Sequence, residues 1–167
     1  MRRLAVLAAV VALFCSAAAS AQKAILVVRH GEKISEEDER LTEAGRARAG
    51  RLAEMLRKSE IAAIYSTDTE RTIGTAKPLA DALGQKIRLY ETEPKKGDVD
   101  FVNLVGRLHS EVPDGIVLVV GHSNTVPLIL KALGCAEAVT IASDEFDNMF
   151  VVVPEPNGKA TLVRLRY

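Results

Sequence analysis

Short apolar runs alternate with amphipathic segments along this chain, and that alternation limits its fold more than any other feature. The runs at residues 23–28 and 116–120 consist mainly of aliphatic side chains, which is typical of strands buried on both faces of a parallel sheet. Segments with apolar residues at helical spacing lie between the runs. The pattern predicts a three-layer α/β/α sandwich whose central sheet is mixed but largely parallel.

Further elements follow from the same periodicity and from residues that start or stop helices. Thr42 is the expected N-cap of a helix that ends near Arg57, and Gly84 and Gly134 are expected to end two later helices. Pro78 should kink the helix before Gly84 or begin its second half. The expected strands, in addition to the two above, are 61–65, 87–90, 146–153 and 160–166.

The first 21 residues have the three parts of a secretory signal peptide. Arg2 and Arg3 precede an apolar stretch at residues 4–14, and a small-residue cleavage site ends at Ala21. The apolar stretch is shorter than the roughly 20 residues that a membrane-spanning helix needs. We therefore expect cleavage after Ala21, a single mature domain at residues 22–167, a periplasmic or secreted location, and contact with a membrane only through the leader before cleavage.

Charge and cysteine content exclude several classes of partner and cross-link. The chain has 22 basic and 22 acidic residues, and loss of Arg2 and Arg3 leaves 20 against 22. That balance gives no general attraction to nucleic acid, so no nucleic-acid partner is expected. Cys15 leaves with the leader, and Cys135 alone cannot form an internal disulfide. We expect Cys135 to be a buried bystander, and the charged run 36–40 to be a solvated loop.

Histidine and arginine residues follow three of the expected strands. Arg29 and His30 end the first strand, Arg71 follows the second, and His122 follows the run at 116–120. Ligands bind at the carboxyl ends of strands in open α/β sheets. Two imidazoles and two guanidinium groups at one edge would hold a tetrahedral dianion, because guanidinium groups match pairs of phosphate oxygens. A helix expected to open at Asn124 would add N–H donors. The sequence therefore predicts a site for a phosphoryl group.

The sequence gives no comparable signal for a metal site or for other common catalytic motifs. His30, His109 and His122 lack the short spacing of zinc ligands, and His109 lies in an amphipathic segment where a solvent-facing position is expected. The sequence contains neither a phosphate-binding loop of the GxxxxGKS type nor a GxSxG motif. We expect no metal and no cofactor.

The motifs occur in a recognisable order. Arg29-His30-Gly31-Glu32 comes first, Arg71 next, and Gly121-His122-Ser123-Asn124 last. From about residue 24 to residue 167 the chain resembles the histidine phosphatase superfamily, which includes the phosphoglycerate mutases. The sequences at 29–33, 121–125 and 145–148 together make it similar to a small secreted bacterial branch. The resemblance implies a phosphoglycerate mutase-like fold.

The resemblance also implies a role for each matching residue. His30 would accept the phosphoryl group as nucleophile, and Arg29, Arg71 and His122 would hold its nonbridging oxygens. Ser123 and Asn124 would line the phosphate pocket, and Lys33 would contact the rest of an anionic substrate. A neutral imidazole is nucleophilic without an added base, so this chemistry requires no metal.

The acid that protonates the leaving group is less defined. In much of the family a glutamate after the third strand does so, and Glu91 stands at that place. The segment that follows differs from the usual one, so Glu93 and Asp98 are alternatives. A phosphoramidate or another good leaving group would need no such acid.

These expectations combine into a metal-independent phosphatase that hydrolyses phosphomonoesters through a phosphohistidine on His30. Its substrate would be a phosphorylated small molecule or an envelope compound. Two alternatives stay open at this point. One is a mutase of the phosphoglycerate type, and the other is a noncatalytic binder of phosphorylated envelope sugars.

Overall fold

The computed structural model describes residues 23–92 and 101–167, in which six strands form a single sheet. The strands are β1 (Ala24–Arg29), β2 (Ile61–Ser66), β3 (Ile87–Leu89), β4 (Ile116–Gly121), β5 (Asn148–Pro154) and β6 (Ala160–Arg166). Their order is β3-β2-β4-β1-β5-β6; the first four are parallel, and β5 and β6 are antiparallel to their neighbours. The predicted mixed, largely parallel sheet is confirmed.

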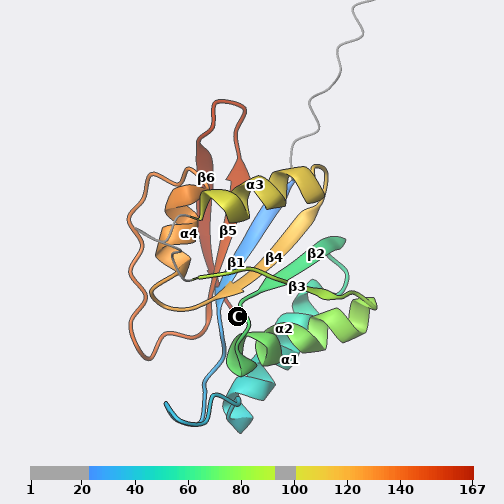
Figure 1. Ribbon diagram of the computed structural model, residues 1–167, viewed down its shortest axis with the longest axis vertical. Coiled ribbons are helices and arrows are strands. Elements are labelled where there is room, and N and C mark those ends of the chain that lie inside the picture. The colour runs from blue at the N-terminus through green and yellow to red at the C-terminus, as the bar shows by residue number, and fades with distance from the viewer. Residues whose placement is uncertain (1–22, 93–100) are drawn as a thin grey trace, which may run out of the picture.

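Helices cover both faces of this sheet (Figure 1). They are α1 (Glu43–Leu56), α2 (Glu70–Leu83), α3 (Val102–Glu111) and α4 (Val126–Ala132). Alternate residues of β1 point to opposite faces, as the two-residue period of a strand requires. Leu26 packs in the core with α1 and α2, whereas Ile25 packs in the core with α3 and α4. The arrangement is the expected three-layer sandwich.

The helix ends agree with the sequence in most places. The Thr42 side chain accepts a hydrogen bond from the Gly45 N–H at the start of α1, and Gly84 ends α2 in the left-handed region with φ of 63°. Pro78 lies inside α2, which continues through it as one helix. The helix expected to open at Asn124 begins at Val126 instead, so that prediction is wrong by two residues. The reason is a tight turn, in which the Thr125 and Val126 N–H groups donate to the His122 carbonyl oxygen.

The strand register brings two histidines together. Parallel pairing of β1 with β4 aligns Arg29 with Gly121, and the His30 N–H donates to the Gly121 carbonyl oxygen at 2.9 Å. His30 directly follows β1 and His122 directly follows β4, so both lie at the same edge of the sheet. The leader and the predicted cleavage site are outside the described residues; within residues 23–92 and 101–167, no helix is both long and apolar enough to cross a bilayer.

Two glycines allow the loop after β1 to lie against the start of α1. A Cβ atom at Gly45 would come within 2.4 Å of the Glu32 carbonyl oxygen, and one at Gly31 would meet the Gly45 carbonyl oxygen at 3.0 Å. Backbone atoms cannot move aside as the tip of a side chain can. The loop that follows His30 can take this position only because residues 31 and 45 are glycines without a Cβ atom.

Gly45→Ala should destabilise the protein even though alanine is the better helix former. Overpacking against backbone costs about 1–3 kcal/mol, which exceeds the gain of roughly 0.5–1 kcal/mol from replacing a helical glycine. Chemical denaturation measures the free energy of unfolding. Gly50→Ala is the matched control, because nothing lies within 4 Å of a Cβ there and it occupies the same helix. We expect Gly50→Ala to be neutral or stabilising; equal effects of the two changes would contradict the close contact.

Candidate active site

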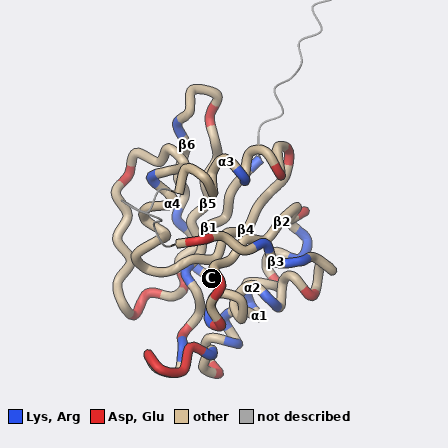
Figure 2. The backbone as a smooth tube through the Cα atoms, viewed as in Figure 1, with Lys and Arg blue, Asp and Glu red and all other residues tan. Residues whose placement is uncertain are grey.

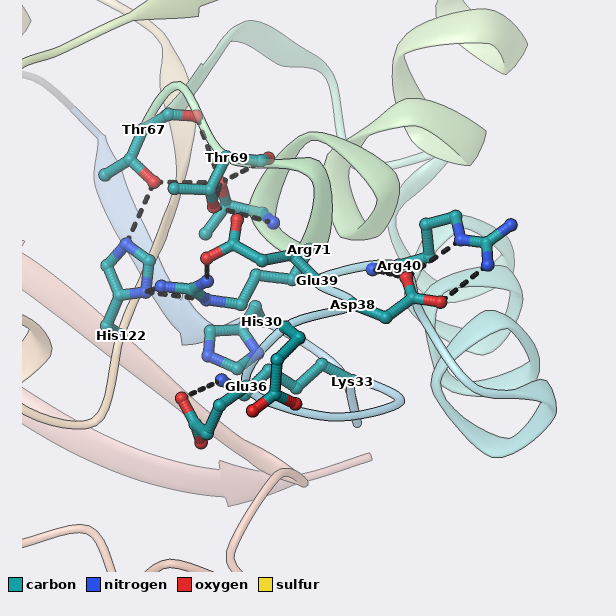
Figure 3. Close-up of polar contacts among 12 residues, drawn as sticks. His30, Lys33, Glu36, Asp38, Glu39, Arg40, Thr67, Thr69, Arg71 and His122 are labelled. Atoms are coloured by element: carbon teal, nitrogen blue, oxygen red, sulfur yellow. Dashed lines mark hydrogen bonds and ion pairs between the residues drawn. The ribbon is translucent and has the colours of Figure 1, made fainter.

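A cavity of about 950 Å³ opens at the carboxyl edge of β1 and β4. It brings together every predicted site residue except Glu91. Its lining includes Arg29, His30, Lys33, Arg71, His122, Ser123 and Asn124, together with Ile34, Ser35, Glu36, Thr69, Thr92, Thr125, Leu128, Ser143 and Phe146. Figure 3 shows His30, Arg71 and His122 grouped at the centre of this region.

The hydrogen bonding of His30 determines which of its ring nitrogens can react. Its Nδ1 lies 2.7 Å from the Gly31 carbonyl oxygen. A carbonyl oxygen only accepts, so Nδ1 carries the proton, and the lone pair of the neutral ring is on Nε2. Burial lowers the pKa of His30 to about 3, and the neighbouring His122, Arg71 and Arg29 act in the same direction. His30 is therefore a neutral imidazole with a free nucleophilic nitrogen at any pH near neutrality.

His122 is neutral as well, with the opposite tautomer. Its Nδ1 accepts hydrogen bonds from Nε and Nη2 of Arg71, at 3.3 and 3.2 Å. The proton is therefore on Nε2, which donates to the Thr67 hydroxyl at 3.0 Å. Burial, aided by the charges of Arg71 and Arg29, lowers the pKa of His122 to about 4. The rings of His30 and His122 meet edge to face with centroids 5.4 Å apart.

Arg71 reaches the cavity from the second residue of α2. Besides its two contacts with His122, it donates through Nη1 to the Glu39 carboxylate. Glu39 belongs to the loop between β1 and α1, so the guanidinium group joins two separate parts of the site. Glu39 therefore competes with a phosphoryl group for the Nη1 side of Arg71.

Arg29 also lines the cavity and is held by the segment before β5. Its Nη1 lies 2.9 to 3.0 Å from the carbonyl oxygens of Ala142, Ser143 and Glu145, and its guanidinium carbon lies 3.9 Å above the Phe146 ring. Its Nε is buried without a partner among the described residues. An unsatisfied buried donor costs about 1–3 kcal/mol, so this N–H is a candidate donor to a bound oxyanion.

The loop after Gly31 forms the rim of the cavity. An antiparallel bridge between Lys33 and Leu41 closes this loop at its base, and the Thr42 N–H donates to the Glu32 carbonyl oxygen at 2.9 Å. The Lys33 ammonium pairs with the Glu36 carboxylate at 2.5 Å. Lys33 is thus at the cavity, as predicted, but its charge is already paired.

The structure does not bring the predicted acid into the cavity. Glu91 is exposed and is not among the lining residues, although the next residue, Thr92, is. Glu93 and Asp98 lie outside the described residues. The role of Glu91 stays a prediction, as does the expectation of metal-free chemistry. Among the residues described, His, Cys, Asp and Glu side chains form no group of three that could hold a metal.

The sequence analysis does not identify Thr67 and Glu39 as residues of the site, although they contact His122 and Arg71. Thr67 directly follows β2 at the same edge as His30, which is the signal that could have identified it. The expectation for the charged run 36–40 holds only in part, because Glu39 turns inward to Arg71. Two predictions about burial are confirmed: Cys135 is buried, and His109 is exposed on α3.

Comparison with solved structures gives the same architecture. The protein histidine phosphatase SixA complexed with tungstate has a TM-score of 0.66 and 20% identity, over 86% of this chain and 96% of that one. Mycobacterial glucosyl-3-phosphoglycerate phosphatase with inorganic phosphate has a TM-score of 0.65 and 17% identity, over 87% of this chain and 96% of that one. Bacillus stearothermophilus YhfR has a TM-score of 0.65 and 17% identity, over 84% of this chain and 95% of that one. At these identities the likeness shows the fold.

Sequence comparison identifies the family. No curated protein matches the chain, but the family model of the histidine phosphatase superfamily (branch 1) matches residues 25–112. This match spans more than half of the chain and contains His30 and Arg71. The chain therefore belongs to branch 1 of the histidine phosphatase superfamily.

Proposed function

We propose that this protein is a phosphatase that hydrolyses phosphomonoesters through a phosphohistidine on His30. The observation that carries the proposal is the hydrogen bond from Nδ1 of His30 to the Gly31 carbonyl oxygen. It directs the lone pair to Nε2 and fixes the ring in a cavity that also contains two arginines. A binding site has no need of a neutral imidazole held as a nucleophile in this way.

The reaction proceeds in two displacements. Nε2 of His30 attacks phosphorus as the bond to the ester oxygen breaks, and the leaving alcohol takes up a proton from water. Water then attacks the phosphohistidine, the P–N bond breaks, and phosphate leaves with the neutral imidazole restored. Covalent capture divides one difficult displacement into two easier ones.

Arginine side chains supply the charge that this transfer needs. Catalysis of phosphoryl transfer consists mainly of positioning and of stabilising charge on the nonbridging oxygens. Arg71 does so once the phosphoryl group has displaced Glu39, and Nε of Arg29 is a further donor. His122 can donate from Nε2 to a phosphoryl oxygen once that N–H leaves its present acceptor, the Thr67 hydroxyl, while Nδ1 still accepts from Arg71.

Substrate class and location belong to the same proposal. The names of two structural neighbours identify them as phosphatases, one of proteins and one of a sugar phosphoglycerate, which supports a phosphorylated substrate. Within that class, the proposal is a phosphorylated small molecule or envelope compound. Arg2 and Arg3, the apolar stretch at residues 4–14 and the small residues that end at Ala21 support export and cleavage after Ala21. The mature domain would then be residues 22–167.

Turnover of para-nitrophenyl phosphate in the presence of a chelator tests the function. The protein is purified after expression of the full chain, and released phosphate is followed together with acid-labile phosphate on the protein. We expect multiple turnovers that the chelator does not reduce. Loss of turnover in chelator would refute the metal-free mechanism. Phosphate that moves only between positions of a phosphoglycerate would indicate a mutase, and binding without turnover would indicate a noncatalytic binder.

A further inference from the structure

Two cations of the active site are paired with carboxylates from a single loop. Glu39 contacts Arg71, and Glu36 contacts Lys33 at 2.5 Å (Figure 3). Figure 2 shows the acidic part of this loop as a continuous red segment between β1 and α1. Both pairs lie at the cavity that the proposed function assigns to the phosphoryl group.

The pairing is specific to these two glutamates. Two other acidic residues of the same run have partners within the loop: Glu37 accepts from the Ser35 hydroxyl, and Asp38 pairs with Arg40. Only Glu36 lines the cavity directly, and only Glu39 reaches an arginine of the site. A loop whose acidic residues only face solvent would not direct two of them to cations of the site and leave the other two bonded within the loop.

Charge balance then limits what else a substrate can carry. Among the described side chains that line the cavity, Arg29, Lys33 and Arg71 are the cations. Glu36 and Glu39 offset two of them, and both histidines are neutral, so these five charged side chains sum to +1. The carboxylates of Glu32, Asp144 and Glu145 also act on Arg29, so the net charge of the described side chains at the site is not above +1. A phosphomonoester dianion would make the occupied site negative. A phosphomonoester with one ammonium group has a net charge of −1 and would make it neutral.

We propose that Glu39 and Glu36 make this site selective for phosphomonoesters whose alcohol carries an ammonium group, and that they disfavour esters carrying a second anion. The proposal rests on the proposed function, because it concerns the part of the substrate beyond the phosphoryl group. The sequence predicts that Lys33 contacts an anionic part of the substrate. Under this proposal it does not, because Glu36 already neutralises its charge.

Exposure of the two side chains is consistent with this role. The Glu39 side chain is 36% exposed, so its carboxylate can turn aside when a phosphoryl group binds Arg71 and still stay next to the site. Glu36 is 86% exposed at the rim. An ammonium group beyond the ester oxygen meets two carboxylates there, whereas a substrate carboxylate meets like charge. Because these groups are hydrated, each contact changes the rate only modestly.

Three small esters of similar size measure the selectivity. They are 2-aminoethyl phosphate, 2-hydroxyethyl phosphate and carboxymethyl phosphate, which carry an ammonium, a neutral and a carboxylate group. We expect kcat/KM to fall in that order, by about tenfold from first to last. Glu39→Gln should reduce the range to about twofold, and Glu36→Gln should reduce it in part. Glu37→Gln, which removes the same charge from the same loop, should retain the full range. Equal rates for the three esters, or an unchanged range in Glu39→Gln, would overturn the proposal.

A separate readout distinguishes this failure from failure of the proposed function. If the wild-type protein hydrolyses para-nitrophenyl phosphate but treats the three esters alike, only the selectivity is wrong. If it hydrolyses none of the four, the proposed function fails, and calorimetry with the same three esters still measures charge selectivity as an order of dissociation constants. Thermal melting of each variant separates loss of folding from loss of selectivity.

Discussion

Replacing His30 by alanine is expected to lower kcat for para-nitrophenyl phosphate by at least about a thousandfold, in line with the loss of other enzyme nucleophiles. The variant should also form no acid-labile phosphate on the protein. The reason is that Nε2 of His30 is the atom that forms the P–N bond, and no neighbouring group can replace it. Nδ1 of His122 is covered by Arg71, and its Nε2 carries a proton.

Steady-state kinetics and acid-labile phosphate together check this result. His109→Ala is the matched control, since His109 is exposed on α3 and does not line the cavity. It should retain wild-type activity. A His30→Ala protein that melts like the wild type and keeps more than a tenth of its activity would contradict the nucleophilic role. An equal loss in His109→Ala would point to general damage.

Arg71→Ala is expected to lower kcat/KM by about a hundredfold or more, which is the usual effect of removing a donor to a developing oxyanion. The guanidinium group lines the cavity and donates two N–H bonds to His122 and one to Glu39. Lysine presents a single ammonium group and cannot make the same fork. Arg71→Lys should therefore recover only a small part of the activity.

Arg57→Ala serves as the control for loss of an arginine. Arg57 lies at the end of α1, is exposed, and pairs with Glu54 at 2.8 Å away from the cavity. Its removal should leave kcat/KM unchanged. Activity retained in Arg71→Ala would show that Arg29 and backbone donors suffice for the phosphoryl group, and would remove Arg71 from the mechanism.

The sequence predicts the frame of this protein well because its signals are local. Aliphatic runs predict the strands, Thr42 and Gly84 mark helix ends, and the positions of Arg29, His30 and His122 follow from where strands end. Parallel pairing then places those residues at one edge. Each of these steps needs only a short segment and a general rule about sheets.

Other parts of the site depend on tertiary contacts that no short segment reveals. Glu39 looks like any acidic loop residue until the loop folds back on Arg71, which is 32 residues away. Thr67 becomes part of the site only through its contact with His122, 55 residues away. The start of α4 is displaced from Asn124 because Thr125 uses its hydroxyl to bond the His122 N–H at 2.9 Å.

The rim loop is fixed at its base independently of what lies at its tip. The bridge between Lys33 and Leu41 and the contact of Gly31 with Gly45 anchor both ends, whereas residues 34–40 make their hydrogen bonds largely among themselves and with Arg71. Insertions, deletions or new charges within 34–40 can therefore accumulate without displacing the nucleophile. If the loop sets substrate preference as proposed, that preference can change through these seven residues while the position of the nucleophile stays the same.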